Sequence, residues 1–267
     1  MKKFRFVVPN FFTSVNFLMG VFAILLATGA LMKGEGIILA CQLVVIGALA
    51  DKLDGFAAKK LDAKSEFGAQ FDSLADLVAF GLAPAFITFF AFRTWASDWY
   101  CGHKAMMSVS LSFYVLCAAM RLARYNAVDI SGGGHPRYFS GLASTLAGSM
   151  LVIAVILAKS YGFFVPENAK WMKLFPVFMV LLGALMVSTF YLPKILRREN
   201  KLFDLVQTVL IVVVYICGFS LVVPEGYLIL AVLIVIYITV GMTNGLIHRE
   251  KIAEEERQLS GEGNDEG

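Results

Sequence analysis

The sequence predicts an all-α polytopic membrane protein with about eight transmembrane helices and both termini in the cytoplasm. Three observations support this fold class. Hydrophobic residues make up 58% of the 267 residues and charged residues only 16%, a balance that soluble globular domains do not have. The apolar residues are gathered into long runs, and most basic residues lie in every second loop between those runs.

Eight apolar runs have about the length of a transmembrane helix, which needs about 20 residues to cross the hydrocarbon core. The run that precedes Asp51 is short, and the fourth run ends in the charged stretch MRLARYN, so seven spans are the alternative. The first run is too long for the apolar part of a secretory signal, and we expect it to stay in the membrane. The runs cover about 11–32, 36–50, 69–92, 105–120, 139–158, 174–192, 204–223 and 227–247.

The basic residues predict the orientation of the chain. With the N-terminus in the cytoplasm, 17 of the 23 Lys and Arg residues fall on the cytoplasmic side and six on the opposite side. Cytoplasmic loops carry such an excess, and an even number of spans preserves it. We expect a core of about six helices at 1–192, two additional helices at 193–248, and a disordered acidic cytoplasmic tail at 249–267.

Two other classes of site find little support. The net charge is only +3, and the basic residues lie in short loops where membrane topology explains them, so we expect no nucleic-acid partner. The cysteines are widely separated and mostly lie inside apolar runs, which favours a packing role over a disulfide framework or a zinc site. They are Cys41, Cys101, Cys117 and Cys217.

Four acidic residues interrupt the apolar pattern in the stretch DKLDGFAAKKLDAKSEFGAQFDSLAD at 51–76. If the second span continues as a helix to about residue 60, Asp51 and Asp54 share one face at its cytoplasmic end. Asp72 and Asp76 are four residues apart and share a face at the start of the third span. Two antiparallel helices would direct all four carboxylates to one point, where like charges repel unless they are neutralised.

A divalent cation neutralises such a cluster economically, because Mg²⁺ and Mn²⁺ prefer oxygen ligands and are often shared between carboxylates and phosphates. The alternative for Asp51 and Asp54 is the solvated end of a span, with ion pairs to Lys52 or Lys59. That alternative does not account for Asp72 and Asp76, because acidic side chains inside a membrane are costly and usually functional. The sequence therefore predicts a metal site.

The acidic stretch resembles the signature of the CDP-alcohol phosphatidyltransferase family, D-x2-D-G-x2-A-R-x8-G-x3-D-x3-D. Seven of the eight fixed positions match at the family's spacing. The exception is Lys59, where the family usually has Arg, so the positive charge is kept and the two-pronged donor is lost. The resemblance implies a membrane enzyme in which an alcohol displaces CMP from a CDP-linked lipid, with two divalent cations, Mg²⁺ or Mn²⁺, as cofactors.

The family implies a role for each acidic residue. Asp51, Asp54 and Asp72 would be metal ligands. Asp76 would hold the second ion and take the proton from the attacking hydroxyl, which requires hydrogen-bond reach to that hydroxyl. The resemblance also implies a homodimer in the cell membrane of a prokaryote, with its active site facing the cytoplasm.

The small residues of the signature fit a nucleotide in this interpretation. Gly55, Ala58 and Gly68 would leave room for the cytidine end of the CDP-lipid, with Lys59 beside its phosphates. Taken alone, such small residues are also common where membrane helices pack closely.

Three further stretches are similar to the branch of this family that uses serine as the acceptor. They are VVPNFFTSVNFLMG in the first span, MRLARYN at 120–126 and RYFSGLAST at 137–145, which differs from that branch because Ala143 and Thr145 replace two prolines. The resemblance covers about the first 190 residues, including MVS at 186–188. It implies CDP-diacylglycerol and L-serine as substrates, within membrane lipid.

The same stretches contain the polar residues predicted to bind substrate. Arg121 and Arg124 are suited to a carboxylate or phosphate, and Asn126 adds an amide. The alternative for the two arginines is an anchoring role at the end of a span.

Three more residues have weaker signals. Asn10 and Thr13 lie where the family places the nucleotide, although both are also common at helix starts. Arg137 is suited to lipid phosphates, and it would also be stable among the headgroups without a specific ligand.

Two alternative functions remain open at this point. Another acceptor alcohol, such as glycerol 3-phosphate, inositol phosphate or choline, would keep the reaction and change the pocket. A cation transporter would use the four acids as a transit site. Transporters carry such groups near the membrane midplane, whereas these acids are predicted at one edge, which favours chemistry at the interface.

Overall fold

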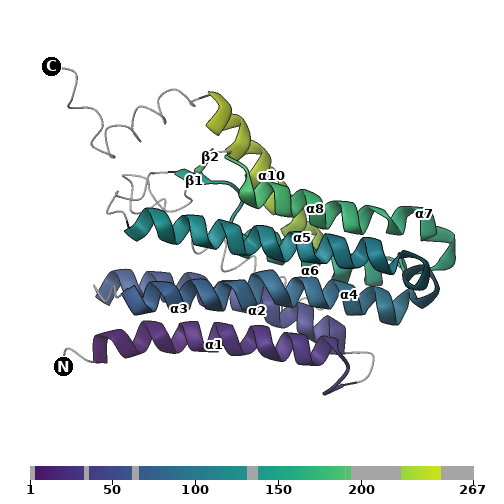
Figure 1. Ribbon diagram of the computed structural model, residues 1–267, viewed down its shortest axis with the longest axis horizontal. Coiled ribbons are helices and arrows are strands. Elements are labelled where there is room, and N and C mark those ends of the chain that lie inside the picture. The colour runs from purple at the N-terminus through teal and green to yellow at the C-terminus, as the bar shows by residue number, and fades with distance from the viewer. Residues whose placement is uncertain are drawn as a thin grey trace.

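The computed structural model describes residues 4–32, 36–61, 66–130, 138–189, 191–193 and 224–247. The long helices from α1 to α8 lie side by side and run in alternating directions along one axis, and α10 crosses them obliquely (Figure 1). The helices are α1 (Phe4–Ala27), α2 (Gly36–Leu61), α3 (Glu66–Asp76), the π-helix η1 (Leu77–Leu82), α4 (Ala83–Trp95), α5 (Ser97–Ile130), α6 (Ser144–Ser160), the 3-10 helix η2 (Pro166–Asn168), α7 (Ala169–Met172), α8 (Leu174–Val187) and α10 (Pro224–Ile247). Two three-residue strands, β1 (Tyr138–Ser140) and β2 (Tyr191–Pro193), pair antiparallel.

The predicted helical membrane architecture is confirmed, and the number of eight spans and the cytoplasmic location of both termini stay predictions. Within the described residues, four helical segments are long and apolar enough to cross a membrane: Asn10–Ala27, Glu66–Trp95, Ser97–Ala127 and Pro166–Val187. Gly36–Ala48, Ser144–Ser160 and Pro224–Val240 are shorter apolar helices. The predicted span at 204–223 and the predicted tail at 249–267 lie outside the described residues.

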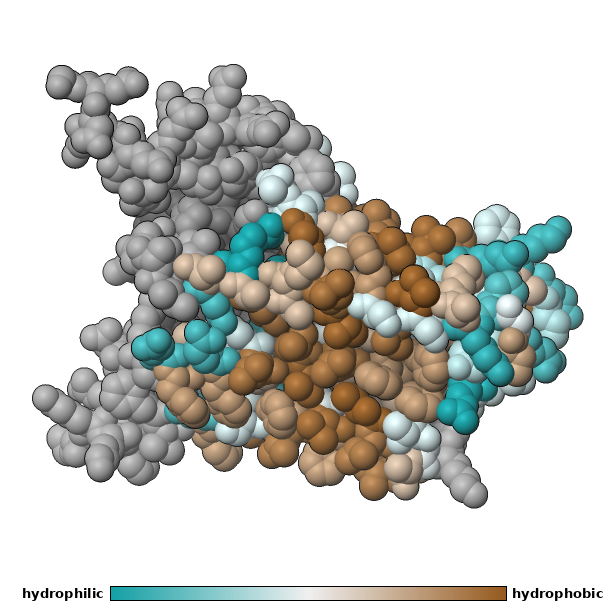
Figure 2. Space-filling model, viewed as in Figure 1, coloured by the Kyte–Doolittle hydropathy of each residue, from teal (hydrophilic) through white to brown (hydrophobic). Residues whose placement is uncertain are grey.

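The surface has the pattern expected for a protein in a bilayer. On the face shown in Figure 2, a broad hydrophobic band crosses the middle of the bundle, and hydrophilic residues gather at both ends of the described surface. Trp95 and Trp99, at the junction of α4 and α5, and Trp171 on α7 lie at the end of the bundle away from the β1–β2 pair (Figure 1). Tryptophan is enriched where the hydrocarbon meets the headgroups, so this end of the bundle fits a membrane interface.

The third helical segment contains a π-helix that the sequence pattern does not reveal. In η1 the Ala83 N–H donates to the carbonyl of Val78, five residues back, in place of the usual four. The hydroxyl of the buried Tyr114 on α5 donates to the Phe80 carbonyl at 2.9 Å. In a regular α-helix the Phe80 carbonyl would accept from residue 84, but Pro84 has no N–H, so the Tyr114 hydroxyl supplies a donor that the ladder cannot.

Two glycines let neighbouring helices approach the backbone of η1. A Cβ atom on Gly20 of α1 would lie 2.8 Å from Ala79 Cα, and one on Gly148 of α6 would lie 2.8 Å from the Phe80 carbonyl oxygen. Small residues at such contacts are typical of membrane helix packing. Helices α1, α5 and α6 thus contact η1 directly. Because η1 directly follows α3, this packing helps to fix the orientation of α3 and of the acidic residues on it.

Candidate metal centre

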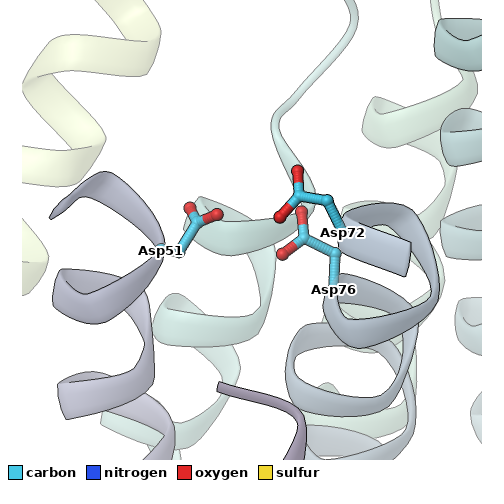
Figure 3. Close-up of side chains that lie close together, drawn as sticks. All are labelled: Asp51, Asp72 and Asp76. Atoms are coloured by element: carbon cyan, nitrogen blue, oxygen red, sulfur yellow. The ribbon is translucent and has the colours of Figure 1, made fainter. Parts of the chain in front are cut away.

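Three of the four predicted acids converge. Asp51 on α2 and Asp72 and Asp76 on α3 each offer a carboxylate oxygen, and these oxygens all lie within 4.8 Å of one another. Figure 3 shows the Asp51 carboxylate pointing across the space between the two helices toward the other two. Asp76 is buried, and Asp51 and Asp72 are partly buried. We call these three residues the acidic cluster.

The local sequence explains this arrangement. Helix α2 extends beyond its apolar part and reaches Leu61, which meets the condition set in the sequence analysis and places Asp51 on a continuous helix. Asp72 and Asp76 are separated by one helical turn and therefore share a face of α3. The π-helix begins directly after Asp76.

The acidic cluster fits a divalent cation. Three carboxylates at this separation repel one another strongly where the surroundings exclude water. The Asp72 Oδ1 atom is buried and has no hydrogen-bond partner within the described part of the chain. A buried carboxylate oxygen without a donor is costly, and hard cations such as Mg²⁺ and Mn²⁺ take carboxylate oxygens as ligands.

Arg121 on α5 brings a positive charge to this region. Its guanidinium interacts electrostatically with Asp76 and Asp51, and its Nη1 donates to the Ser144 hydroxyl at 2.7 Å. Ser144 is buried at the first turn of α6. The hydrogen bond fixes one edge of the guanidinium, so the predicted anion-binding residue is held close to the acidic cluster.

Arg124, one turn further along α5, has different partners. Its Nη1 donates to the Val187 carbonyl at 2.9 Å, and its Nη2 lies 3.3 Å from the Met186 carbonyl oxygen and 3.4 Å from that of Ser188. The last carbonyls of a helix have no partner within the helix, and a basic side chain satisfies them well. Arg124 therefore caps the C-terminal end of α8.

Two residues that follow β1 complete this cap. Gly141 has a φ of +81°, and a Cβ there would lie 2.5 Å from the Met186 carbonyl oxygen. The Leu142 N–H donates to the Leu185 carbonyl at 3.0 Å. We call Arg124, Gly141, Leu142 and the end of α8 the α8 junction. It joins three stretches that the sequence analysis singled out separately.

Asn126 connects α5 to α3. Its Oδ1 accepts a hydrogen bond from the Ser73 hydroxyl at 2.8 Å, and its Nδ2 donates to Gln70 Oε1 at 3.2 Å. Ser73 directly follows Asp72, so these bonds hold the part of α3 that carries the acidic cluster. The amide predicted to contact serine is thus hydrogen-bonded to α3.

The remaining predicted residues are only partly described. Thr13 is buried on α1, Asn10 lies one turn before it, and Gly68 lies in the first turn of α3. The side chains at four positions of α2, and Arg137 as a whole, lie outside the described residues. Those four positions are Asp54, Gly55, Ala58 and Lys59.

One buried polar residue on α1 was not among the predicted site residues. Asn16 on α1 is fully buried, and neither atom of its amide has a hydrogen-bond partner within the described residues. An amide in the middle of an apolar run was the available signal. The run reads VVPNFFTSVNFLMG, and Asn16 is its second asparagine.

Comparison with known proteins agrees with the resemblance noted above. A protein of Helicobacter pylori (strain J99) named CDP-diacylglycerol–serine O-phosphatidyltransferase is 37% identical over 203 residues, which are 74% of this chain and 77% of the relative. A Methanocaldococcus jannaschii protein of the same name is 27% identical over 230 residues, 86% of this chain and 91% of the relative. A Saccharomyces cerevisiae protein of that name is 36% identical over 124 residues, 44% of this chain and 40% of the relative.

The family comparison covers most of the described bundle. The family model described as CDP-alcohol phosphatidyltransferase matches residues 6–191, which include the acidic cluster, Arg121 and the α8 junction. The chain belongs to the CDP-alcohol phosphatidyltransferase family.

Proposed function

We propose that this protein transfers the phosphatidyl group of CDP-diacylglycerol to the hydroxyl of L-serine, yielding phosphatidylserine and CMP. The observation that carries the proposal is the convergence of Asp51, Asp72 and Asp76 in a chain of this family. The shared name of its bacterial, archaeal and yeast relatives supports serine as the acceptor.

The acidic residues hold two divalent cations, Mg²⁺ or Mn²⁺, in this proposal. Asp51, Asp54 and Asp72 are ligands, and Asp76 is both a ligand and the general base. When bound, the cations offset the negative charge that develops on the diphosphate. The support is the spacing of the carboxylates and the chemistry of the donor set.

The reaction is a substitution at phosphorus. A bond forms between the serine hydroxyl oxygen and the phosphorus of the phosphatidyl group, and the bond from that phosphorus to the oxygen bridging to CMP breaks. CMP leaves with the bridging oxygen. The hydroxyl proton passes to the Asp76 carboxylate in this proposal, and the support is that this carboxylate lies next to those of the two proposed metal ligands Asp51 and Asp72.

The surrounding residues bind and orient the two substrates. Arg121, near Asp76, pairs with the serine carboxylate in this proposal. Arg124 and Asn126 support the same pocket through their bonds to α8 and α3. The nucleotide lies along the signature residues of α2 and α3 and the start of α1, and Arg137 meets a lipid phosphate. The nucleotide residues are Asn10, Thr13, Gly55, Ala58, Lys59 and Gly68.

We place the protein in the cell membrane of a prokaryote as a homodimer of eight-span chains, with both termini and the active site in the cytoplasm. Residues 1–192 form the catalytic core, 193–248 two additional helices and 249–267 a tail. The distribution of Lys and Arg and the apolar band of Figure 2 support this arrangement.

A labelled-acceptor assay tests the proposal. Purified protein with CDP-diacylglycerol, Mn²⁺ or Mg²⁺ and labelled serine is expected to release CMP and to form a labelled lipid in equal amounts. Parallel reactions contain glycerol 3-phosphate, inositol phosphate or choline. Labelled lipid with one of these and none with serine would assign a different acceptor. Cation flux into liposomes without nucleotide, and no CMP release, would indicate a transporter instead.

A further inference from the structure

The buried amide of Asn16 requires an explanation. Asn16 is 0% exposed, and its Oδ1 and Nδ2 have no hydrogen-bond partner among the residues that the structure describes. Buried side-chain amides are nearly always hydrogen-bonded, because burying one without a partner is costly. We expect the Asn16 amide to gain a hydrogen-bond partner when substrate is bound.

Asn16 lies against α2 close to the acidic cluster. Its Oδ1 would be 2.9 Å from a Cβ atom placed on Gly47, so the missing side chain of Gly47 provides the space for the amide. Gly47 precedes Asp51 by one helical turn, which is about 6 Å along the axis. The amide is therefore at most about one turn deeper in the bundle than Asp51.

The same side chain lies beside α3. Helices α1 and α3 run in the same direction, and Gly20 of α1 contacts the backbone of Ala79 (Figure 1). Asn16 precedes Gly20 by four residues, and Asp76 precedes Ala79 by three, so each lies one turn back along its own helix. Asn16 and Asp76 therefore lie at about the same level of the bundle, on the neighbouring helices α1 and α3.

We propose that Asn16 binds the ammonium group of the acceptor amino acid, an inference that rests on the proposed function. The Oδ1 atom accepts a hydrogen bond from the ammonium, and rotation about the soft terminal torsion of Asn lets it face the site. Arg121, which approaches the acidic cluster from α5, pairs with the carboxylate of the same molecule.

Replacement of Asn16 by Leu tests the proposal, because Leu has a similar size and no amide. The matched control is Thr88→Val on α4, which removes a polar group that is also fully buried. Serine is the acceptor, and 3-hydroxypropionate, which has the hydroxyl and carboxylate of serine and lacks the amino group, is measured as an inhibitor that competes with serine. Asn16→Leu is expected to raise the KM for serine about tenfold or more, the size of effect expected from a lost buried hydrogen bond to a charged group.

The same variant is expected to keep the inhibition constant of 3-hydroxypropionate and the KM for CDP-diacylglycerol within about twofold of the parent, since neither ligand uses the amide. Thr88→Val is expected to change none of these values. An unchanged KM for serine, or an equal loss of serine and 3-hydroxypropionate affinity, would overturn the assignment of Asn16.

A second variant keeps the test informative if Asn16→Leu does not fold. Gly47→Ala introduces a Cβ 2.9 Å from Oδ1 and must displace the amide. It is expected to raise the KM for serine and to leave that for CDP-diacylglycerol unchanged, and no change in the serine KM would count against the proposal. If the parent protein forms no lipid from serine, the proposed function fails. If it does and both variants keep the parent serine KM, only the role of Asn16 fails.

Discussion

The acidic cluster and the α8 junction each receive one arginine from the same helix, and the two arginines do different things. Arg121 lies near Asp76 and Asp51 with one donor fixed by a serine hydroxyl. Arg124 donates to carbonyls at the end of α8. The motif MRLARYN thus contributes one arginine to the acidic cluster and one to the α8 junction, and the hydrogen-bond partners of each side chain distinguish the two roles.

The largest expected effect is at the acidic cluster. Asp76→Asn keeps the size of the side chain and removes both a charge and a proton acceptor. We expect turnover to fall about a thousandfold or more, since general bases contribute factors of about 10² to 10⁴ and the residue is also a proposed ligand. The measurement is kcat for CMP release, with thermal unfolding in detergent as the control. Activity near that of the parent would remove Asp76 as the base.

The next effect separates the two arginines. Arg121→Gln is expected to raise the KM for serine about ten- to a hundredfold, the loss expected for one charge-assisted hydrogen bond, with little change in unfolding temperature. Arg124→Gln is expected to do the reverse, lowering the unfolding temperature with a smaller change in KM, because α8 loses its cap. Steady-state kinetics and thermal unfolding on both variants check this. Identical profiles would contradict the division of roles.

Gly141 offers a test of the α8 junction alone. Gly141→Ala places a Cβ 2.5 Å from the Met186 carbonyl oxygen at a φ of +81°, so both sterics and backbone strain oppose it. We expect a loss of about 1–3 kcal/mol in the free energy of unfolding. Gly102→Ala is the matched control, because a Cβ there has no heavy atom within 4 Å. Equal stability of Gly141→Ala and Gly102→Ala would show that the Met186 carbonyl can move away from an added Cβ without loss of stability.

The smallest expected effect concerns η1. Tyr114→Phe removes the donor to the Phe80 carbonyl and fills nearly the same volume. An unsatisfied buried carbonyl costs about 1–3 kcal/mol, so the unfolding temperature is expected to fall. Because η1 follows Asp76 directly, we also expect a moderate fall in kcat. Unfolding and kcat both unchanged would show that Tyr114 does not stabilise the π-helix.

The acidic cluster was accessible from sequence because its geometry is local. Spacings of three and four residues put carboxylates on one face of a helix, and α2 meets the condition set for Asp51 and Asp54 because it continues past its apolar run to Leu61. Asp51, Asp72 and Asp76 converge as predicted. The fourth acid, Asp54, stays a prediction because its side chain lies outside the described residues.

The features that sequence did not reveal depend on contacts between distant segments. The donors of Arg124 reach carbonyls more than 60 residues away, so the motif alone did not separate it from Arg121. The π-helix requires Tyr114, Gly20 and Gly148 to meet one turn of backbone. Asn16 lies in a stretch that resembles the serine branch of the family, but the sequence assigned it no role, and only the structure shows that it is buried with an unpartnered amide among the described residues.

Binding of Mn²⁺ measured by electron paramagnetic resonance tests the central claim most directly, because it reports on the acidic cluster without turnover. The parent protein is expected to bind Mn²⁺, and Asp72→Asn is expected to weaken that binding at least about tenfold, since it removes a charged oxygen ligand. Arg124→Gln is expected to bind Mn²⁺ as the parent does. Equal Mn²⁺ affinity in the parent and Asp72→Asn would contradict the assignment of the acidic cluster as a metal centre.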